Sequence, residues 1–492
     1  MKLSISPEEA KRYAAETDYR VLPVSSELIA DTLTPMQVLR ILRRVSAHTY
    51  LLESISGPDH RGRYTFLGYD PKLGISCRNG RLKVGDLEIE TADPALYLRQ
   101  MLAKYRSPKL AGLPPFTGGL VGYFSYDYLG YQEPSTRTAK EDDAHFNDLD
   151  LMLFDKVIAF DHFRQKIILI ANIRLDEPET EYRRAEMALR QMAELLRNGQ
   201  PAEEPVSRMT GEMTPLFDKA AYCEMVEKAK HYIVEGDIFQ IVLSNRFSVP
   251  FEGSLLNTYR MLRTINPSPY MFYFSGTDVE VAGASPETLV KLENGVLHTF
   301  PLAGTRPRGR TEAEDQALEA DLLRDEKELA EHNMLVDLGR NDLGRISRFG
   351  TVEVERLRTI ERYSHVMHIG SAVRGEIRED CDALDAVGAV LPAGTLSGAP
   401  KIRACQLIGQ LEGAKRGIYG GAVGYLSFQG DLDTCIAIRL AYRKGNTVYV
   451  RSGAGIVADS VPENEYQECL NKAAAVIRAL KEAEVPDDAF AD

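Results

Sequence analysis

The spacing of apolar positions changes along the chain, and it predicts the elements. In the N-terminal part, the pattern predicts a helix at 35–47 and a long polar helix at 179–197. Short apolar runs rich in β-branched and aromatic residues predict strands between them. These runs are YLLESI (50–55), RYTFLGY (63–69), VIAFD (157–161) and KIILIAN (166–172). This part of the chain is therefore predicted to mix helices with strands.

A stretch without periodicity follows. Residues 197–215, RNGQPAEEPVSRMTGEMTP, are rich in proline, glycine and charge, which predicts a linker. We therefore divide the chain into an N-terminal region at 1–200 and a second region at 213–485.

Beyond the linker, helical stretches alternate irregularly with apolar strands. The run CIAIRLAYRKGNTVYVRSGAG at 435–455 predicts a hairpin that turns at Lys444, Gly445 and Asn446. No regular strand–helix–strand spacing supports a doubly wound sheet. The predicted fold class is therefore α+β, with antiparallel sheets flanked by helices.

One pattern occurs twice. GGLVGYFSYD at 118–127 and GGAVGYLSFQ at 420–429 share their glycines and their alternation. Chance recurrence is one explanation. The other is that the two halves of the chain contribute similar strands to one paired core.

Helical spacing returns near the end of the chain, at SVPENEYQECLNK (460–472). Ser460 and Glu463 have the spacing of a capping box, so a helix is predicted to begin there. At about 100° per residue, the side chains of Glu465, Glu468 and Lys472 project along one border of the apolar face. This border is either an ordinary charge cluster on a solvated flank or part of a site. The apolar face consists of Tyr466, Cys469, Leu470, Ala473, Val476, Ile477 and Leu480.

A second acidic helix is predicted at 311–342, where Thr311 and Glu314 again have capping-box spacing. Glu328 and Glu331 lie three residues apart on it, as two glutamates of the last helix do. Two such pairs could hold one hard cation through oxygen ligands, and Mg²⁺ fits best because it is usually bound by one or two carboxylates. Acidic helices are common, however, so the spacing alone does not establish a metal site.

The predicted hairpin strand carries a cation. Strand alternation places Arg439 on one face with Cys435, Ala437 and Ala441, where a guanidinium has room to bind a carboxylate through two hydrogen bonds. A solvated strand face is the alternative, but such faces are rarely built of Cys and Ala. Glycines in SGAGI (452–456) would weaken a strand unless something approaches its backbone, so their N–H groups could bind an anion.

Composition narrows the classes of partner. The 492 residues carry a formal net charge of −13 and no Lys/Arg-rich block, which argues against nucleic acid. No apolar run of about 18 residues predicts a membrane span, and the N-terminus has no signal-peptide pattern. GTLSGAPK at 394–401 lacks the spacer of a phosphate loop, so we reject nucleotide binding. The six cysteines form no CxxC pair or metal spacing, which suits a reducing compartment, and we expect a cytoplasmic protein.

Nine sequence blocks resemble, in order, those of one family. They are GDIFQIVLSNRF, ASPE, PLAGTRPRG, DEKELAEHNMLVDLGRND, YSHVMHI, LPAGTLSGAPK, YGGAVGYLSF, DTCIAIRLA and SGAGIVADSVPENEYQECLNKA. Together with LLES at 51–54, they resemble the chorismate-utilising enzymes, and among these the large subunit, component I, of anthranilate synthases. The resemblance implies an α+β fold of antiparallel β-sheets packed together and wrapped by helices. It also implies Mg²⁺-dependent amination of chorismate to anthranilate, with release of pyruvate.

The resemblance assigns a metal and a substrate site. It implies that Glu331 and Glu468 are the Mg²⁺ ligands, supported by Glu328 and Glu465. The metal would bridge them to the ring carboxylate of chorismate, which Lys472 helps to neutralise. Other residues implied to contact chorismate are Arg439 and Tyr419 at the enolpyruvyl carboxylate, the backbone at Gly453, Ala454 and Gly455, and Gly304, Thr305 and Thr395 along the pocket.

Catalytic roles are implied in the same way. Glu287 in ASPE matches the general acid that protonates the departing C4 hydroxyl, and His368 matches a histidine associated with pyruvate elimination. Family members that add water carry a Lys where this chain has Gln240, and aminodeoxychorismate synthases carry a Lys where it has Ala303. Direct amination is therefore expected. Two alternatives stay open: an enzyme that stops at aminodeoxyisochorismate, and a non-catalytic tryptophan-sensing partner protein.

A partner and an effector are implied as well. Ammonia is implied to come from a glutamine amidotransferase subunit, component II, because no cysteine of this chain lies in a glycine-flanked nucleophile turn. Feedback inhibition by tryptophan is implied by LLES and NPSPYMFY, although these segments are also typical of a plain strand and of a turn before one. The implied effector residues are Leu51, Glu53, Ser54, Asn266, Pro267, Ser268, Pro269, Tyr270 and Met271.

Overall fold

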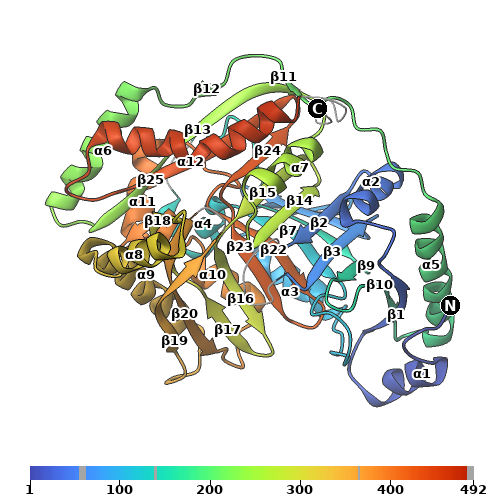
Figure 1. Ribbon diagram of the computed structural model, residues 1–492. Coiled ribbons are helices and arrows are strands. Elements are labelled where there is room, and N and C mark those ends of the chain that lie inside the picture. The colour runs from blue at the N-terminus through green and yellow to red at the C-terminus, as the bar shows by residue number, and fades with distance from the viewer. Residues whose placement is uncertain (55–61, 138–140, 364–365, 485–492) are drawn as a thin grey trace.

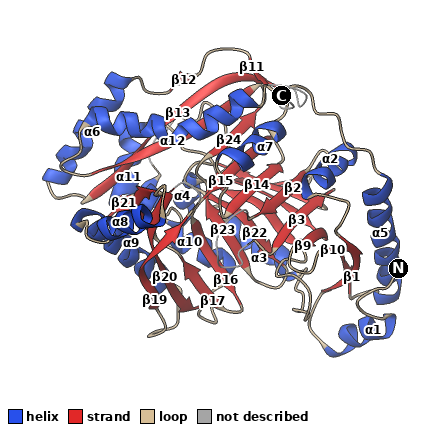
Figure 2. Ribbon diagram, viewed as in Figure 1, coloured by secondary structure: helices blue, strands red, loops and turns tan. Residues whose placement is uncertain are grey.

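A computed structural model describes residues 1–54, 62–137, 141–363 and 366–484. Ile55 of the predicted strand, two residues of the YSHVMHI block and residue 485 lie outside these ranges. Strands occupy the middle of the molecule and helices its flanks (Figure 2). Every ladder between the described strands is antiparallel, which confirms the predicted α+β fold class.

The first sheet joins strands from both parts of the chain. Its spatial order is β1 (Val21–Ile29), β10 (Lys166–Arg174), β9 (Lys156–Asp161), β3 (Tyr64–Tyr69), β2 (Thr49–Glu53), β14 (Tyr270–Ser275), β15 (Val279–Ser285), β24 (Leu440–Lys444), β25 (Thr447–Ile456), β13 (Gln240–Glu252) and β11 (Arg208–Met209), while β12 (Thr214–Pro215) and β21 (Gly398–Ala399) also pair with β13. The predicted strands of the N-terminal region and the predicted hairpin are thus confirmed, and they belong to one sheet.

The second sheet also joins strands from both parts of the chain. Its order is β18 (Leu302–Pro307), β20 (Val366–Glu376), β17 (Val296–Thr299), β16 (Thr288–Glu293), β23 (Leu432–Ile436), β22 (Ala422–Ser427), β7 (Gly119–Phe124), β8 (Leu149–Phe154), β4 (Leu73–Arg78), β5 (Arg81–Val84) and β6 (Leu87–Glu90), and β19 (Glu353–Arg362) pairs with β20. Strands from both predicted regions therefore lie in both sheets.

The repeated glycine pattern marks the seam of the second sheet. β7 and β22 pair directly, with Gly122 opposite Gly424. A Cβ atom on Gly122 would lie 2.0 Å from the carbonyl oxygen of Asp150, and one on Gly424 would lie 2.0 Å from that of Asp433. Only glycine fits between such close neighbours. The prediction that the two halves contribute similar strands to one core is confirmed.

Helices cover the sheets on several sides (Figure 1). On the first sheet, α2 packs on β2 and β3, α5 on β10, α7 on β15 and α12 on β25, whereas α9 and α10 pack on the second sheet. The helices are α1 (Pro7–Glu16), α2 (Pro35–Val45), α3 (Pro94–Ala103), α4 (Leu129–Gln132), α5 (Pro178–Asn198), α6 (Lys219–Val234), α7 (Leu256–Ile265), α8 (Glu312–Leu322), α9 (Glu326–Gly344), α10 (Ala383–Val390), α11 (Lys401–Glu412) and α12 (Pro462–Glu482), with 3₁₀ turns η1 (Tyr126–Tyr128), η2 (Pro134–Thr136) and η3 (Gly394–Leu396). Among the residues described, no helix combines the length and the apolar character that crossing a bilayer requires.

Two helix starts differ from the prediction. α12 begins at Pro462 with Val461 as its N-cap, and the Ser460 hydroxyl instead accepts a hydrogen bond from the Val457 N–H at 3.1 Å. The predicted capping box is therefore wrong there. Proline suits the first turn of a helix because its missing N–H would have no partner in that turn.

The predicted acidic helix at 311–342 is two helices. Thr311 caps α8, accepting from the Glu314 N–H, but the Glu314 carboxylate accepts from the Arg310 N–H, so only half of the predicted capping box is present, and α8 ends at Leu322. The Asp325 carboxylate then accepts from the Lys327 and Glu328 N–H groups at 3.1 and 3.2 Å and starts α9. A second N-cap signal inside the acidic run therefore overrides its continuous helical pattern.

The predicted alternation from Cys435 to Ala441 is interrupted. β23 ends at Ile436 in the second sheet and β24 begins at Leu440 in the first, so residues 437–439 cross between the sheets. Arg439 has φ +51° at this crossing. Such a conformation costs a non-glycine residue on the order of 1–3 kcal/mol and persists only where the surrounding structure holds it. Arg439 therefore owes its position to a break between two strands.

Candidate active site

The loop between β15 and β16 places Glu287 beside Thr395 of η3. The Thr395 hydroxyl donates to Glu287 Oε1 at 3.2 Å, and the Ile436 N–H donates to the Glu287 carbonyl at 3.0 Å. Burial raises the pKa of Glu287 to about 7, against the lowering effects of the Thr395 hydroxyl and of the charges on Arg439 and Lys472. This carboxyl group can therefore hold a proton near neutral pH.

Arg439 faces the same site. Burial lowers the pKa of its guanidinium, although the charges of Glu287 and Tyr363 oppose that shift. Within the described parts of the chain, the guanidinium has no hydrogen-bond partner, so its donors are available to an anionic ligand.

His368 on β20 is held by the turn within β18. Its Nδ1 lies 2.8 Å from the Gly304 carbonyl oxygen and 3.1 Å from the Thr305 hydroxyl. A carbonyl only accepts, so Nδ1 carries the proton and Nε2 is the acceptor of the neutral ring. Burial lowers the pKa of His368, and so does the charge of Arg439, while the bond to Gly304 opposes them. The ring is therefore neutral at pH 7 and can accept a proton.

The two glutamate pairs, Glu328 with Glu331 on α9 and Glu465 with Glu468 on α12, share one negatively charged region between these helices. Burial raises the pKa of Glu331, and the charges of Glu328 and Glu468 raise it further. Burial also raises the pKa of Glu465, which the Ser460 hydroxyl lowers and the Glu468 charge raises. Glu331 and Glu468 belong to different helices, and the charge of Glu468 raises the pKa of Glu331, so the two carboxylates lie within electrostatic range of each other.

The negative charge of this region would attract a cation, but its carboxylates do not surround a metal position. Among the described residues, no three His, Cys, Asp or Glu side chains gather closely enough to hold a metal ion. Lys472 forms an ion pair with Glu468 at 2.6 Å and donates to the Gly453 carbonyl at 3.2 Å. The lysine thus supplies the local positive charge, and the repulsion among the carboxylates is what a divalent cation would relieve.

The glycines of β25 allow two side chains to approach the backbone. A Cβ atom on Gly453 would lie 2.9 Å from the Tyr419 hydroxyl, and one on Gly455 would lie 2.9 Å from Gln240 Nε2. Ala454 between them is fully buried. The close approach expected for SGAGI is therefore present, and the structure places Tyr419 and Gln240 at the strand that the sequence assigned to an anion.

A cavity of about 420 Å³ lies between the two sheets, apart from these residues. Of the predicted effector residues, Glu53, Ser54, Pro269, Tyr270 and Met271 line it. The other four do not. Leu51 is buried in the core, and the segment at 266–268 caps the end of α7. Two segments about 200 residues apart thus meet around one cavity.

The cavity also has walls that the sequence analysis missed. They come from β3 and from three strands of the second sheet, and nothing in the linear pattern links these segments to LLES. The missed residues with polar or aromatic side chains include Arg63, Tyr64, Phe66, Lys291, Glu293, Tyr425 and Asp433.

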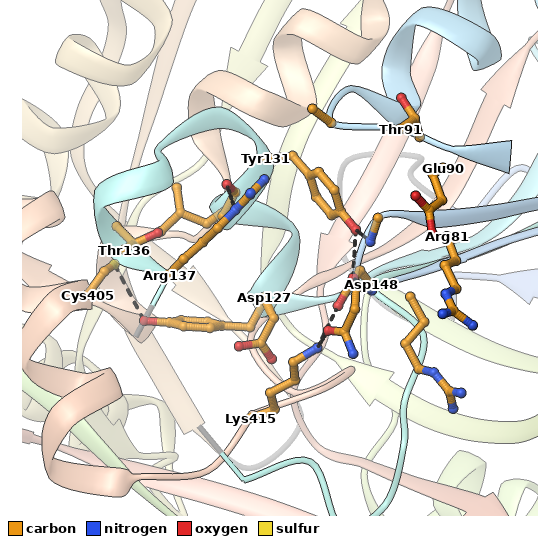
Figure 3. Close-up of a pocket in the computed structure, with 17 residues that line it drawn as sticks. Arg81, Glu90, Thr91, Asp127, Tyr131, Thr136, Arg137, Asp148, Cys405 and Lys415 are labelled. Carbon is orange, nitrogen blue, oxygen red and sulfur yellow. Dashed lines mark hydrogen bonds and ion pairs between the residues drawn. The ribbon is translucent and has the colours of Figure 1, made fainter. Parts of the chain in front are cut away.

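A separate, polar hollow of about 970 Å³ contains none of the predicted site residues (Figure 3). Tyr131 donates to Asp148 at 2.8 Å, and Lys415 donates to the same carboxylate at 3.2 Å. Asp127 and Cys405 also line it. Lys415 is paired with Asp142 and Asp148, whereas among the described residues no ion pair is formed by Arg78, Arg81 or Arg137.

A family profile described as chorismate binding enzyme matches residues 48–478. Anthranilate synthase component 1 of Acetivibrio thermocellus is 46% identical over 483 residues, covering 95% of this chain and 96% of that protein. The same component of Aquifex aeolicus is 44% identical over 495 residues, covering 98% of this chain and 99% of that protein.

Solved structures of other proteins superpose on this chain over most of its length. The crystal structure of anthranilate synthase component I from Streptococcus pneumoniae superposes with a TM-score of 0.77 at 38% identity, over 91% of this chain and 98% of that one. The menaquinone-specific isochorismate synthase of Escherichia coli superposes with a TM-score of 0.70 at 21% identity, over 96% and 98% of the two chains. The second likeness concerns the fold alone.

Proposed function

The chain belongs to the chorismate binding enzymes and groups there with anthranilate synthase component 1, and on that basis we propose that it converts chorismate and ammonia to anthranilate and pyruvate. One observation carries the proposal. A glutamic acid with a pKa of about 7, Glu287, lies near a buried guanidinium, Arg439, that has no hydrogen-bond partner in the described residues. A proton donor and an anion receptor are what loss of a hydroxyl group from an anionic ring requires.

The first step is amination. Ammonia forms a bond to C2 of chorismate, the ring double bonds shift, and the C4–O bond breaks. Glu287 donates its proton to the departing hydroxyl, which leaves as water. Arg439, with the Tyr419 hydroxyl, binds the enolpyruvyl carboxylate and so orients the ring.

The second step is elimination. The Nε2 atom of neutral His368 accepts the proton from C2 while the C3–O bond breaks, and the ring becomes aromatic. The departing enolpyruvate gains a proton at its methylene carbon and becomes pyruvate. His368 is oriented for this role by its Nδ1–H bond to the Gly304 carbonyl.

The nucleophile follows from two positions. Gln240, on β13, is a neutral amide and cannot deprotonate water, whereas ammonia attacks without that help. Ala303, on β18, offers no amine for covalent attack on the ring. Both residues therefore favour direct amination over hydration or a covalent route.

Mg²⁺ is the cofactor that we propose. Glu331 and Glu468 would hold it, with Glu328 and Glu465 beside them, and it would supply positive charge against the ring carboxylate of chorismate. The mutual repulsion of these carboxylates supports the assignment.

The ammonia source and the regulation are also proposals. A glutamine amidotransferase subunit would supply ammonia, which agrees with the component 1 names of the relatives. Burial raises the pKa of Cys77, Cys435 and Cys469, so these thiols do not suit glutamine hydrolysis. Tryptophan would bind in the 420 Å³ cavity and inhibit the enzyme, in a cytoplasmic pathway of tryptophan biosynthesis.

The test is to incubate the purified chain with chorismate, Mg²⁺ and ammonium, and to identify the product by fluorescence and mass. Anthranilate is expected at high pH, where free NH₃ is available, whereas glutamine should serve only when the amidotransferase is added. Isochorismate or salicylate as the main product would overturn the proposal. Accumulation of aminodeoxyisochorismate would show that the second step is missing.

A further inference from the structure

We propose that Arg416 is a positioning residue that holds the chorismate-binding segments in place from behind the site. The inference rests on the proposed function. Arg416 follows α11, is only 2% exposed, and touches neither Glu287 nor the glutamate pairs in any recorded contact. Its role therefore has to be exerted through the groups that it binds.

The guanidinium of Arg416 joins two backbone segments of the site. Nη1 donates to the Leu396 carbonyl and Nη2 to the Val242 carbonyl, each at 2.7 Å. Leu396 follows Thr395, whose hydroxyl binds the proposed general acid. Val242 lies opposite Gly455 in the ladder between β13 and β25. One side chain thus connects the η3 turn with β13, the strand that pairs with β25 and so with the glycines of the substrate site.

The same guanidinium lies between two aromatic rings. Its central carbon is 4.5 Å from the ring centroid of Tyr126 and 5.9 Å from that of Tyr419. Both rings are buried, where such cation–π contacts are strongest. Tyr419 is the residue that we assign to the enolpyruvyl carboxylate, so its ring is also placed by Arg416.

Glu412 fixes the direction of Arg416. Its two carboxylate oxygens accept from Arg416 Nε at 2.9 Å and Nη2 at 2.5 Å, and also from Arg451 Nη2 at 2.7 Å and from the N–H and hydroxyl of Ser244. Burial would raise the pKa of Glu412, but the charges of Arg416 and Arg451 outweigh it and lower the pKa. The carboxylate is therefore ionised and fully bonded, which makes the arrangement rigid.

The loop of Arg416 is also held from the outside. The Asp127 carboxylate accepts from the N–H groups of Arg416 and Gly417, each at 3.0 Å. Asp127 and Tyr126 line the polar hollow of Figure 3. Arg416 thus contacts two residues that line that hollow, Tyr126 and Asp127, as well as the segments of the proposed active site.

Arg451 provides a matched control. It is equally buried, carries the same charge and binds the same Glu412 carboxylate. Its other donors go to the Ser244 hydroxyl and to the Lys415 carbonyl, and none goes to η3 or to a carbonyl opposite Gly455. Loss of either arginine leaves Glu412 paired with the other, so the two variants differ chiefly in what holds the site.

The experiment compares Arg416→Met with Arg451→Met in the full-length chain. We measure kcat and KM for chorismate with ammonium and Mg²⁺, chorismate binding by calorimetry without ammonium, and Tm. Arg416→Met should lower kcat/KM by ~100-fold, the cost typical of misplacing catalytic groups by about 1 Å. Arg451→Met should lower Tm by as much as Arg416→Met does, but it should keep kcat/KM close to that of the wild type.

A pH profile separates positioning from simple destabilisation. If η3 moves, Glu287 loses the Thr395 hydrogen bond that stabilises its ionised form, so the alkaline limb of kcat/KM should move to higher pH in Arg416→Met alone. Should Arg416→Met fail to fold, Arg416→Lys, which retains the charge but not the planar set of donors, carries the same comparison. Equal losses of kcat/KM in the two arginine variants, or an unmoved limb, would refute the role of Arg416. A wild-type chain that makes no anthranilate would refute the proposed function, and this inference with it.

Discussion

At the scale of single residues, environment rather than residue type decides the chemistry. Glutamates are numerous in this chain, yet among the described glutamates Glu287 is the one whose burial raises its pKa to about 7, although the Thr395 hydroxyl and the charges of Arg439 and Lys472 lower it. His368 is neutral for a related reason, since burial disfavours its charged form. The acid and the base of the proposed reaction are therefore both set by desolvation.

The first prediction is a pH dependence. Glu287 donates a proton only while protonated, so activity is present below its pKa and lost as pH rises through it. With free ammonia held constant, kcat/KM should fall about tenfold per pH unit above the pKa of about 7. Glu287→Gln should lower kcat by ~10²–10⁴-fold. Steady-state rates across pH 5–9 give both results, and a profile without an alkaline limb would exclude Glu287 as the acid.

The second prediction concerns the carboxylate pairs. Glu331→Gln or Glu468→Gln removes one anionic ligand without changing volume, so Mg²⁺ affinity and kcat/KM should each fall by ~100-fold or more while Tm is retained. Glu326→Gln, which removes an exposed charge from the same helix as Glu331, serves as the control. Calorimetric titration with Mg²⁺ alone measures affinity independently of turnover. Near-normal Mg²⁺ binding in both variants would mean that the metal lies elsewhere.

At the scale of elements, the candidate site lies where helices and strands end, or where glycines leave a strand without side chains. Arg439 lies at the crossing between β23 and β24, Thr395 lies in a 3₁₀ turn, and Glu287 lies in the loop after β15. Gly453 and Gly455 thin the strand β25 so that side chains reach its backbone. The sheet ladders on either side position these interruptions, as a scaffold positions functional loops.

The third prediction uses the glycines. A Cβ on Gly453 would lie 2.7 Å from the Leu243 carbonyl oxygen and 2.9 Å from the Tyr419 hydroxyl, so Gly453→Ala must displace backbone and should raise KM for chorismate by at least ~10-fold. Gly455→Ala meets only the flexible end of Gln240 and should cost less. Gly344→Ala, with nothing within 4 Å, should behave as the wild type. Any other ranking of the three KM values would contradict the assigned geometry.

At the scale of the whole molecule, the cavity between the sheets adjoins the proposed active site. Thr288, whose hydroxyl lies 2.9 Å from that of Tyr270, lines the cavity between the sheets and directly follows Glu287. Cys435 lines the same cavity, and the next residue, Ile436, binds the Glu287 carbonyl. The cavity is therefore lined by residues next in the chain to Glu287, the proposed general acid, and to the residue that binds its carbonyl, which is why we expect a ligand there to affect it.

The fourth prediction tests that basis. Ser54→Phe should fill part of the 420 Å³ cavity, abolish tryptophan binding and inhibition, and keep the uninhibited rate. Ser54→Ala leaves the cavity open and should stay inhibited. In the wild type, chorismate should weaken tryptophan binding by the factor by which tryptophan weakens chorismate binding, because linkage is reciprocal. Unaltered tryptophan binding to Ser54→Phe by calorimetry would place the effector site elsewhere.

The sequence by itself determined the local elements and the residue types of the site. Periodicity gave the limits of α2 and α5 to within two residues, and the charge border of α12 was predicted correctly because a helix fixes the direction of each side chain. The repeated glycine pattern left chance recurrence and similar strands in one core as its two explanations; the structure supports the second, because the two strands pair with each other.

The tertiary structure alone decided what those residues do. Desolvation sets the pKa values of Glu287 and His368, and it depends on neighbours that come from distant segments. The break that places Arg439 arises because two successive strands join different sheets, a choice that no local pattern records. The cavity behind Ser54 and the contacts of Arg416 likewise exist only once the two sheets have packed, because burial and long-range hydrogen bonds are properties of the folded chain.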